Sequence, residues 1–220
     1  MPDDALILDR LNNYPSRPLH EVAEIVTATD CFRANPNQKI HYIAISDIIP
    51  QLSIVASRQV LLASEAPSRA KYRLQEGDII TAVSGASTGT PQHASVIVSA
   101  SEAGAICSSG FAVLRNFQGV DPYYLLAFLR SEVFLRQVRR QLRGHAIPAL
   151  STDDLAQVLV PIPPEPLQRR IAHFVQEGIN ASRKGLDNLQ QAESMIRQVL
   201  QGNEGELLGS EAFSIPPSRE

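Results

Sequence analysis

The chain has 220 residues, of which 44% are hydrophobic and 20% are charged, and these proportions are typical of a folded globular protein. The length allows one domain of about 150 residues and an appendage. The net charge of −3 excludes a global basic field for nucleic acid, so that only local basic patches could bind it.

The amino-terminal third predicts two short helices followed by a sheet. Residues 3–13, with Leu6, Leu8 and Leu11, are expected to form a short helix, and a second short helix is expected around Leu19 and Val22. Runs rich in β-branched residues and bounded by Gly, Pro, Ser or Asn then predict strands at 40–45, 78–83, 95–100 and 111–116. Strands and helices do not alternate regularly, so we expect an α+β fold with a mixed or antiparallel sheet rather than a doubly wound one.

A helix is predicted from Pro122 to the residues before Gly144, with Asp121 as its N-cap. Ser151 or Thr152 is expected to cap a short helical turn. The segment VLVPIP that follows is rich in proline and predicts an edge strand.

The segment from Pro163 to Leu200 predicts one helix of about 35 residues, roughly 50 Å long. It carries a coiled-coil-like seam at seven-residue spacing with a broad apolar flank. The predicted partner surface consists of Ile171, Val175, Gly178, Ile179, Gly185, Leu186, Leu189 and Ile196. Two glycines in one column would allow another backbone to approach closely. The alternatives are a break at these glycines and a stripe that packs wholly on its own domain.

The usual catalytic and metal-binding patterns are absent from the sequence. The loop SGASTGT (84–90) lacks the GK[ST] of a phosphate-binding loop, and there is no GxSxG motif. The five histidines have no metal-ligand spacing. Asp153 and Asp154 begin a helical turn, where carboxylates favour the positive helix end. We therefore expect a non-catalytic protein without a cofactor or metal.

The expected compartment is the cytoplasm. Cys31 and Cys107 lie far apart and fit buried thiols in a reducing compartment better than a disulfide framework. The acidic, amphipathic N-terminus is not a signal peptide, and no apolar run approaches the length of a membrane span.

Basic and polar side chains supply the candidates for binding DNA. The helix after Pro122 carries an arginine stripe at i, i+3, i+4, i+7 spacing, which would contact backbone phosphates; the alternative is a solvated face with carboxylate partners. Loops at strand ends are the expected source of base-reading side chains, with the 109–111 turn as a second choice. The candidates are Arg58, Arg69, Lys71, Ser84, Gly85, Ser87, Thr88, Gln92, Arg136, Arg139, Arg140 and Arg143.

The order of several motifs resembles the specificity subunit of type I restriction–modification enzymes. These motifs are LQEGDIITAVSGASTG, GAICSSGFAVLRN, and a long segment from DPYYLLAFLR to LQRRIAHFV. The resemblance covers roughly residues 18–200. The positions that match its strand-and-loop motif and the segment leading into its spacer helix are Gly77, Asp78, Ser84, Gly85, Gly144, Ile147, Leu150, Pro163, Pro164 and Gln168.

The residue patterns predict an N-terminal helix within residues 1–17, a long helix over 164–201 and, because the last stretch is acidic and poor in pattern, a disordered tail at 202–220. The resemblance implies that residues 18–163 form a mixed α/β target recognition domain and that 164–201 form its spacer and dimerisation helix. The resemblance also implies double-stranded DNA, the methyltransferase subunit and the restriction translocase as partners. The subunit itself would direct these enzymes to a DNA sequence and catalyse nothing.

One departure from the family is large. The family usually carries two recognition domains, each followed by a long helix, whereas this chain has one of each. It therefore resembles a half-size subunit, and we expect a homodimer through the long helix. The alternatives are a detached recognition domain of a single-chain restriction–methylation or phage-defence methylase, and a scaffold of the same fold that does not bind DNA, which the net charge of −3 keeps open.

Overall fold

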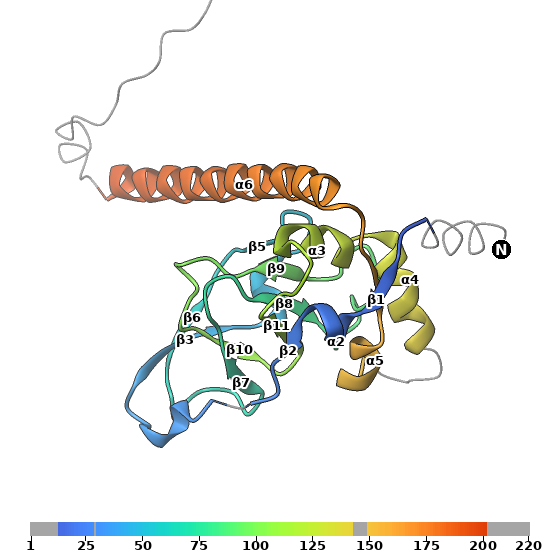
Figure 1. The fold of residues 1–220 in the computed structure, drawn as a ribbon. Helices are drawn as coiled ribbons and strands as arrows, with labels where there is room; N and C mark the ends of the chain where they lie inside the picture. The colour runs from blue at the N-terminus through green and yellow to red at the C-terminus, as the bar shows by residue number, and fades with distance from the viewer. Residues whose placement is uncertain (1–12, 29, 143–148, 202–220) are drawn as a thin grey trace, which may run out of the picture. The chain divides into compact units, whose positions relative to one another are not determined.

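The computed structural model describes residues 13–28, 30–142 and 149–201. Within this part of the chain, two four-stranded sheets share a hydrophobic core and helices border them (Figure 1). The fold is therefore a mixed α/β domain with a long C-terminal helix, as the sequence predicts. The expected helix at 3–13, the tail at 202–220 and Arg143 lie largely or wholly outside the described residues, and residues 16–17 belong to a strand instead of the predicted N-terminal helix.

The first sheet has the strand order β6-β3-β10-β7. Its strands are β6 (Gln59–Leu62), β3 (Lys39–Ile43), β10 (Ile106–Ser108) and β7 (Ala70–Arg73). The pair β3–β10 is parallel, whereas β6 and β7 are antiparallel to their neighbours. Of the mixed and antiparallel arrangements that the sequence allows, this sheet has the mixed one, and its strands β6, β7 and β10 were not predicted.

The second sheet has the order β2-β11-β8-β9 and is antiparallel throughout. Its strands are β2 (Glu24–Ile25), β11 (Phe111–Arg115), β8 (Ile79–Ala82) and β9 (Ser95–Ile97). Two further antiparallel pairs are formed by β1 (Ser16–Pro18) with β12 (Leu159–Pro161), and by β4 (Ile48–Ile49) with β5 (Ile54–Val55). The short elements between strands are α2 (Leu19–Val22), η1 (Phe32–Ala34) and η2 (Ile45–Asp47).

The main hydrophobic core joins the two sheets. Ile43 and Cys107 enter it from the first sheet, and Ile80, Val96 and Val113 enter it from the second. Helix α3 packs against β8 and β9, so that β8 is buried along its whole length. Burial on both faces explains why these strands are predicted by unbroken apolar runs instead of by alternation. Fully burying one such side chain contributes about 1.5–3 kcal/mol.

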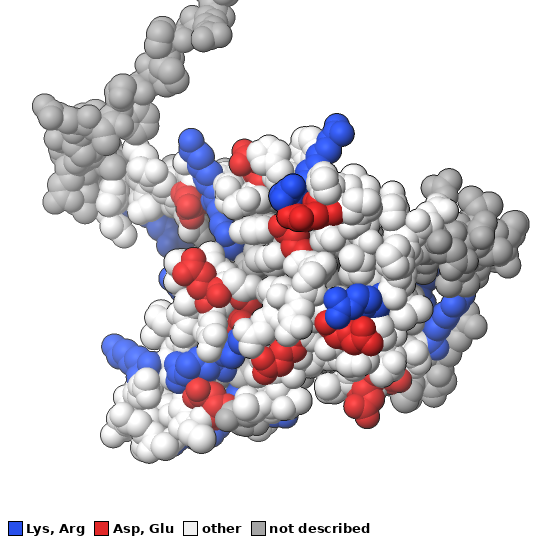
Figure 2. Space-filling view, viewed as in Figure 1, with Lys and Arg blue, Asp and Glu red and all other residues white. Residues whose placement is uncertain are grey.

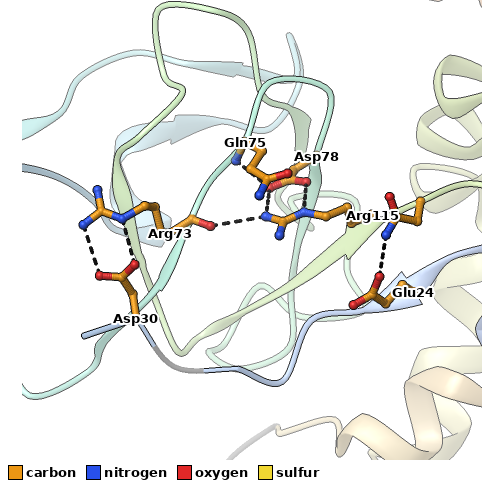
Figure 3. A network of polar contacts seen from close by, with 7 residues as sticks. Glu24, Asp30, Arg73, Gln75, Asp78 and Arg115 are labelled. Carbon is orange, nitrogen blue, oxygen red and sulfur yellow. Dashed lines mark hydrogen bonds and ion pairs between the residues drawn. The ribbon is translucent and has the colours of Figure 1, made fainter. Parts of the chain in front are cut away.

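A network of charged side chains also links the two sheets (Figure 3). Asp78, which precedes β8, accepts hydrogen bonds of 2.7 Å from both Nε and Nη2 of Arg115 on β11. Arg115 Nη2 also donates to the carbonyl of Arg73 on β7, at 3.3 Å. Arg73 in turn pairs with Asp30 at 2.7 Å. The hydrogen bonds to Asp78 are the main reason why the pKa of Arg115 lies above its ordinary value.

The turn before β8 explains the Gly-Asp pair in the sequence. Gly77 has a φ of +85°, which a residue with a side chain rarely adopts. The turn places the Asp78 carboxylate within 2.7 Å of the Gln75 N–H group. One carboxylate therefore closes the turn and holds Arg115 at the same time.

The single helix predicted after Pro122 is two helices, α3 (Pro122–Leu129) and α4 (Glu132–Gln141). Asp121 caps α3 as predicted, since Oδ1 accepts from Tyr123 N–H at 2.8 Å. The break occurs because Ser131 is extended, with ψ of 153°, and its side chain caps the second helix. Ser131 followed by Glu132 is an N-terminal signal that the apolar periodicity hid.

The next two predicted elements are confirmed. Ser151 caps α5 (Thr152–Ala156) by accepting from Asp154 N–H at 3.0 Å. Among the described residues, strand β12 pairs only with β1, which suits its Pro161 because proline cannot donate to a second neighbour. Tyr124 Oη donates to the Pro161 carbonyl at 2.8 Å and so attaches α3 to this strand.

Helix α6 (Glu165–Leu200) is continuous over 36 residues. The long helix predicted from the sequence is confirmed, and the alternative of a break at Gly178 or Gly185 is not observed. The described residues up to Ile179 belong to one compact unit and those from Asn180 onward to a second. The first compact unit therefore extends into the helix beyond the boundary predicted at 163/164. No helix among the described residues is long and apolar enough to cross a membrane.

The two cysteines differ in environment, contrary to the prediction that both are buried. Cys107 is 0% exposed, and burial, followed by the charge of Asp78, raises the pKa of its thiol to about 12. Cys31 is exposed. We expect an aromatic disulfide reagent at pH 8 to modify one thiol in the native protein, because only a thiolate reacts. The second should react only in denaturant; two rapid equivalents in native buffer would contradict this assignment.

Candidate functional site

Four segments far apart in the sequence line one cavity of about 390 Å³, which we call the serine pocket. The turn at η2, the residue before β7, the loop after β8 and the β10–β11 turn all contribute to it. The lining residues are Ala44, Ile45, Ser46, Arg69, Ser84, Gly85, Ser108, Ser109 and Gly110. Arg69, Ser84 and Gly85 are candidates predicted from the sequence, and the structure brings these three together.

Main-chain hydrogen bonds fix the segments that line the serine pocket. Val83 N–H donates to the Gly110 carbonyl at 2.8 Å, and Ser109 N–H donates to the Arg69 carbonyl at 2.7 Å. Asp47 fixes the η2 turn, because its carboxylate accepts from Ala44 N–H at 2.8 Å. The pocket is therefore lined mainly by turns and loops whose backbone is held in place by these hydrogen bonds.

Two glycines keep the serine pocket open. A Cβ atom at Gly110 would lie 2.8 Å from Ile45 Cδ1 and 3.0 Å from Ser84 Oγ. Gly85 has a φ of +104° and nothing within 4 Å of an added Cβ. Gly110 thus leaves room for the Ser84 hydroxyl, and Gly85 allows a ligand to approach the backbone. Ser46 was missed by sequence analysis, because nothing in the sequence places η2 beside β8.

The other candidate residues in the loop after β8 differ in their exposure to solvent. Gln92 is exposed and its side chain is hydrogen-bonded to that of Gln51. Ser87 is partly exposed, and its carbonyl accepts from Thr90. Thr88 is only 3% exposed, so its hydroxyl cannot reach a base edge in this conformation. Ser87 and Gln92 stay candidates for base contact.

The buried side chain of His93 connects this loop to β8 through two hydrogen bonds. Gly89 N–H donates to His93 Nδ1 at 3.1 Å; the neutral imidazole therefore carries its proton on Nε2 and donates to Thr81 Oγ1 at 2.9 Å. The ring also packs edge-on against Phe134, with centroids 5.3 Å apart. Burial lowers the pKa of His93 to about 4.

The low pKa of His93 predicts a stability that depends on pH. The unfolded chain takes up this proton near pH 6.5 and the folded protein only near pH 4. The stabilisation is therefore complete above pH 6.5 and is lost as the pH falls towards 4, a change of about 3 kcal/mol. Urea unfolding of the wild type and of His93→Gln at pH 7, 6, 5 and 4 measures it. The variant should show a shallower fall; parallel curves would contradict the assignment.

Two arginines of the stripe on α4, Arg136 and Arg139, are engaged by other groups of the protein. Arg136 Nε donates to Glu132 at 2.9 Å, Arg139 also pairs with Glu132, and Arg139 Nη1 donates to the Gly89 carbonyl at 2.8 Å. Burial raises the pKa of Glu132, but the hydrogen bonds from the two arginines outweigh it, so that the pKa lies below its ordinary value. Arg140 is exposed and has no ion pair among the described residues.

The other basic candidates lie outside the serine pocket. Arg58 is exposed and its guanidinium donates to the Ser101 carbonyl. The Lys71 ammonium lies 5.1 Å from the centroid of the Tyr72 ring. On the face seen in Figure 2, Lys and Arg are interspersed with Asp and Glu and do not form one basic patch. Among the described residues there is also no cluster of His, Cys, Asp and Glu that could hold a metal ion.

The side chains of the predicted partner surface on α6 are more exposed in the distal part of the helix than in its first part. Ile171 and Val175 are partly buried and Ile179 is 3% exposed, within the first compact unit. Farther along, Leu189 is 65% and Ile196 is 60% exposed. Gly178 and Gly185 are exposed, Leu186 is partly exposed, and a Cβ at either glycine would have nothing within 4 Å. The surface left for a partner is therefore centred on the distal part of the helix.

Comparison with known proteins decides the family. The model of the type I restriction modification DNA specificity domain matches residues 12–190. The chain belongs to this family. None of the curated proteins matches it.

Two solved structures resemble this specificity domain over most of its length. The HsdS subunit from Thermoanaerobacter tengcongensis is 27% identical with a TM-score of 0.64, covering 93% of this chain and 52% of that one. A chain solved in work on complex assembly and conformational transition of the type I R-M system is 27% identical with a TM-score of 0.65, at the same coverage. The specificity domain thus spans about half the length of these relatives.

Proposed function

We propose that this chain recognises a DNA sequence and directs a type I restriction–modification methyltransferase or endonuclease to it. The family match over residues 12–190 carries the proposal. The serine pocket supports it, because a concave surface lined by hydroxyls, one guanidinium and accessible backbone offers donors and acceptors of the kind that read base edges.

The direct test is methylation in cells. The chain is expressed in a host that lacks restriction–modification systems, together with a methyltransferase subunit of type I, and the genome is sequenced for modified bases. We expect one defined motif that disappears when the chain is omitted. Unmodified DNA, despite a soluble complex of the two proteins, would contradict the proposal.

We further propose that two copies associate through the distal part of α6. The exposed Leu189 and Ile196 support this, since large apolar side chains at seven-residue spacing are typical of a helix with a partner. Because the chain covers 52% of its solved relatives, two copies would supply about the length of one of them.

Arg140 is expected to contact the DNA backbone. Changing Arg140 to Gln should weaken binding to all duplexes alike and reduce the slope of log K against log salt by about one, because one phosphate contact is lost. Arg139→Gln is the matched control, since Arg139 already shares Glu132 and holds the Gly89 carbonyl. Fluorescence anisotropy between 50 and 300 mM salt, roughly the range over which such contacts weaken, measures both slopes. Equal slopes for Arg140→Gln and the wild type would assign Arg140 to solvation.

A further inference from the structure

Among the described residues, the Arg69 guanidinium is hydrogen-bonded through one nitrogen only, Nε. Its Nε donates to the hydroxyl of Tyr42 at 3.1 Å, and Tyr42 is 1% exposed and belongs to a hydrophobic cluster on the first sheet. The two terminal nitrogens of Arg69 donate to no described residue. The planar guanidinium is therefore oriented by a buried anchor while its outer fork remains available.

Three arginines on the neighbouring elements are engaged by the protein. Arg73 and Arg115 each bind a carboxylate through two nitrogens. Arg130 donates to the Gln51 carbonyl at 2.6 Å. Arg69 differs because its one side-chain partner is a neutral phenol and because it lines the serine pocket. Its charge is thus not used by a carboxylate among the described residues.

We propose that the fork of Arg69 reads a guanine in the target, donating to O6 and N7 at the major-groove edge. This inference rests on the proposed function. Two parallel donors match the two acceptors of guanine, and this is the commonest specific contact of arginine with DNA. Ser46, Ser84 and Ser109 line the same cavity, and their hydroxyls can donate to or accept from the neighbouring base edges.

A base edge suits this pocket better than a phosphate does. Arg69 is the one Lys or Arg among the residues that line the pocket, and its other lining groups are neutral. Phosphate carries a full charge and no sequence information, and binding it would be as strong on any duplex. A guanine edge instead presents acceptors to Arg69 and, from its paired cytosine, a donor to a serine oxygen.

The test combines a protein change with a change of one DNA atom. Once methylation sequencing has given the motif, duplexes are made in which 7-deazaguanine, which lacks the N7 acceptor, replaces each guanine in turn. Binding to the full chain with its methyltransferase subunit is measured for the wild type and for Arg69→Ala. At one guanine, we expect the wild type to lose roughly ten- to a hundredfold in affinity. Arg69→Ala should show little further loss there, because the contact has already gone.

Two more variants distinguish the effect of the orientation of the Arg69 guanidinium from the effect of its charge. Tyr42→Phe keeps the core but removes the anchoring hydroxyl, so it should relax the motif at the same guanine while leaving other positions unchanged. Arg69→Lys keeps the charge but not the fork, and should relax the same position. Arg169→Ala, which removes an exposed arginine paired with Glu165 on α6, is the control and should leave the motif intact.

The outcomes are distinguishable. A wild type with no motif overturns the proposed function, and the guanine contact with it. A defined motif that Arg69→Ala leaves unchanged at every position overturns the guanine contact alone. Uniform weakening on all duplexes, with the effects of 7-deazaguanine undiminished in Arg69→Ala, also overturns it and makes Arg69 a phosphate contact.

Discussion

Changing Asp78 to Asn is expected to lower the free energy of unfolding by about 3 kcal/mol, near the lower end for a broken buried ion pair. The Asp78 side chain is 1% exposed and that of Arg115 is 21% exposed. The Asn amide would place a donor against a guanidinium donor, and the positive charge would remain without its partner. Urea unfolding at fixed protein concentration measures the loss, because any association also shifts the apparent stability.

Asp30→Asn provides the matched control in the same network (Figure 3). The side chains of this second pair are more exposed, 38% for Arg73 and 22% for Asp30, so solvent screens it and we expect about 1 kcal/mol or less. A loss below 1 kcal/mol for both variants, on the order of a surface pair, would show that the Asp78 carboxylate does not hold the sheets together.

The double change of Leu189 and Ile196 to Lys is expected to convert a dimer to monomers. Burying a side chain of this kind contributes about 1.5–3 kcal/mol, so four of them across a two-fold interface contribute about 6–12 kcal/mol. This is comparable to the cost of association, about 4–15 kcal/mol, and losing it should abolish the dimer. Sedimentation equilibrium of the wild type and of the variant measures the change.

Lysines elsewhere on the same helix provide the control for charge. Gln191 and Ser194 are exposed and lie about 140–160° around the helix from Leu189. Their replacement by Lys adds the same charge and should leave the dimer intact. A wild type that sediments as a monomer at high micromolar concentration, or a control pair that dissociates equally, would contradict an interface at Leu189 and Ile196.

Sequence patterns predicted the elements whose environment is uniform along their length. Strands β8 and β11 are buried on both faces, and α6 repeats a seven-residue pattern over 36 residues. Short strands such as β10, with three residues, carry too little pattern to be recognised. The break between α3 and α4 was missed because both helices bury apolar residues, while only Arg130 and Ser131, the caps of the two helices, separate them.

The candidate site was predicted only in part for a different reason. Ser84 and Gly85 follow a predicted strand, and Arg69 precedes a basic segment, so each was visible in the sequence alone. Their meeting in one cavity depends on the β3–β10 pairing and on the η2 turn, which no local pattern encodes. The role of Tyr42 likewise depends on a contact between residues 27 positions apart.

The separation of the serine pocket from the charged network has a consequence for engineering. Ser46, Ser84 and Ser109 take no part in the contacts among Asp30, Arg73, Asp78 and Arg115 that join the sheets. A library that randomises the three serines should therefore retain a high fraction of folded members. The scaffold could in this way be given new target motifs by selection, without the stabilising second mutations that changes in a core require.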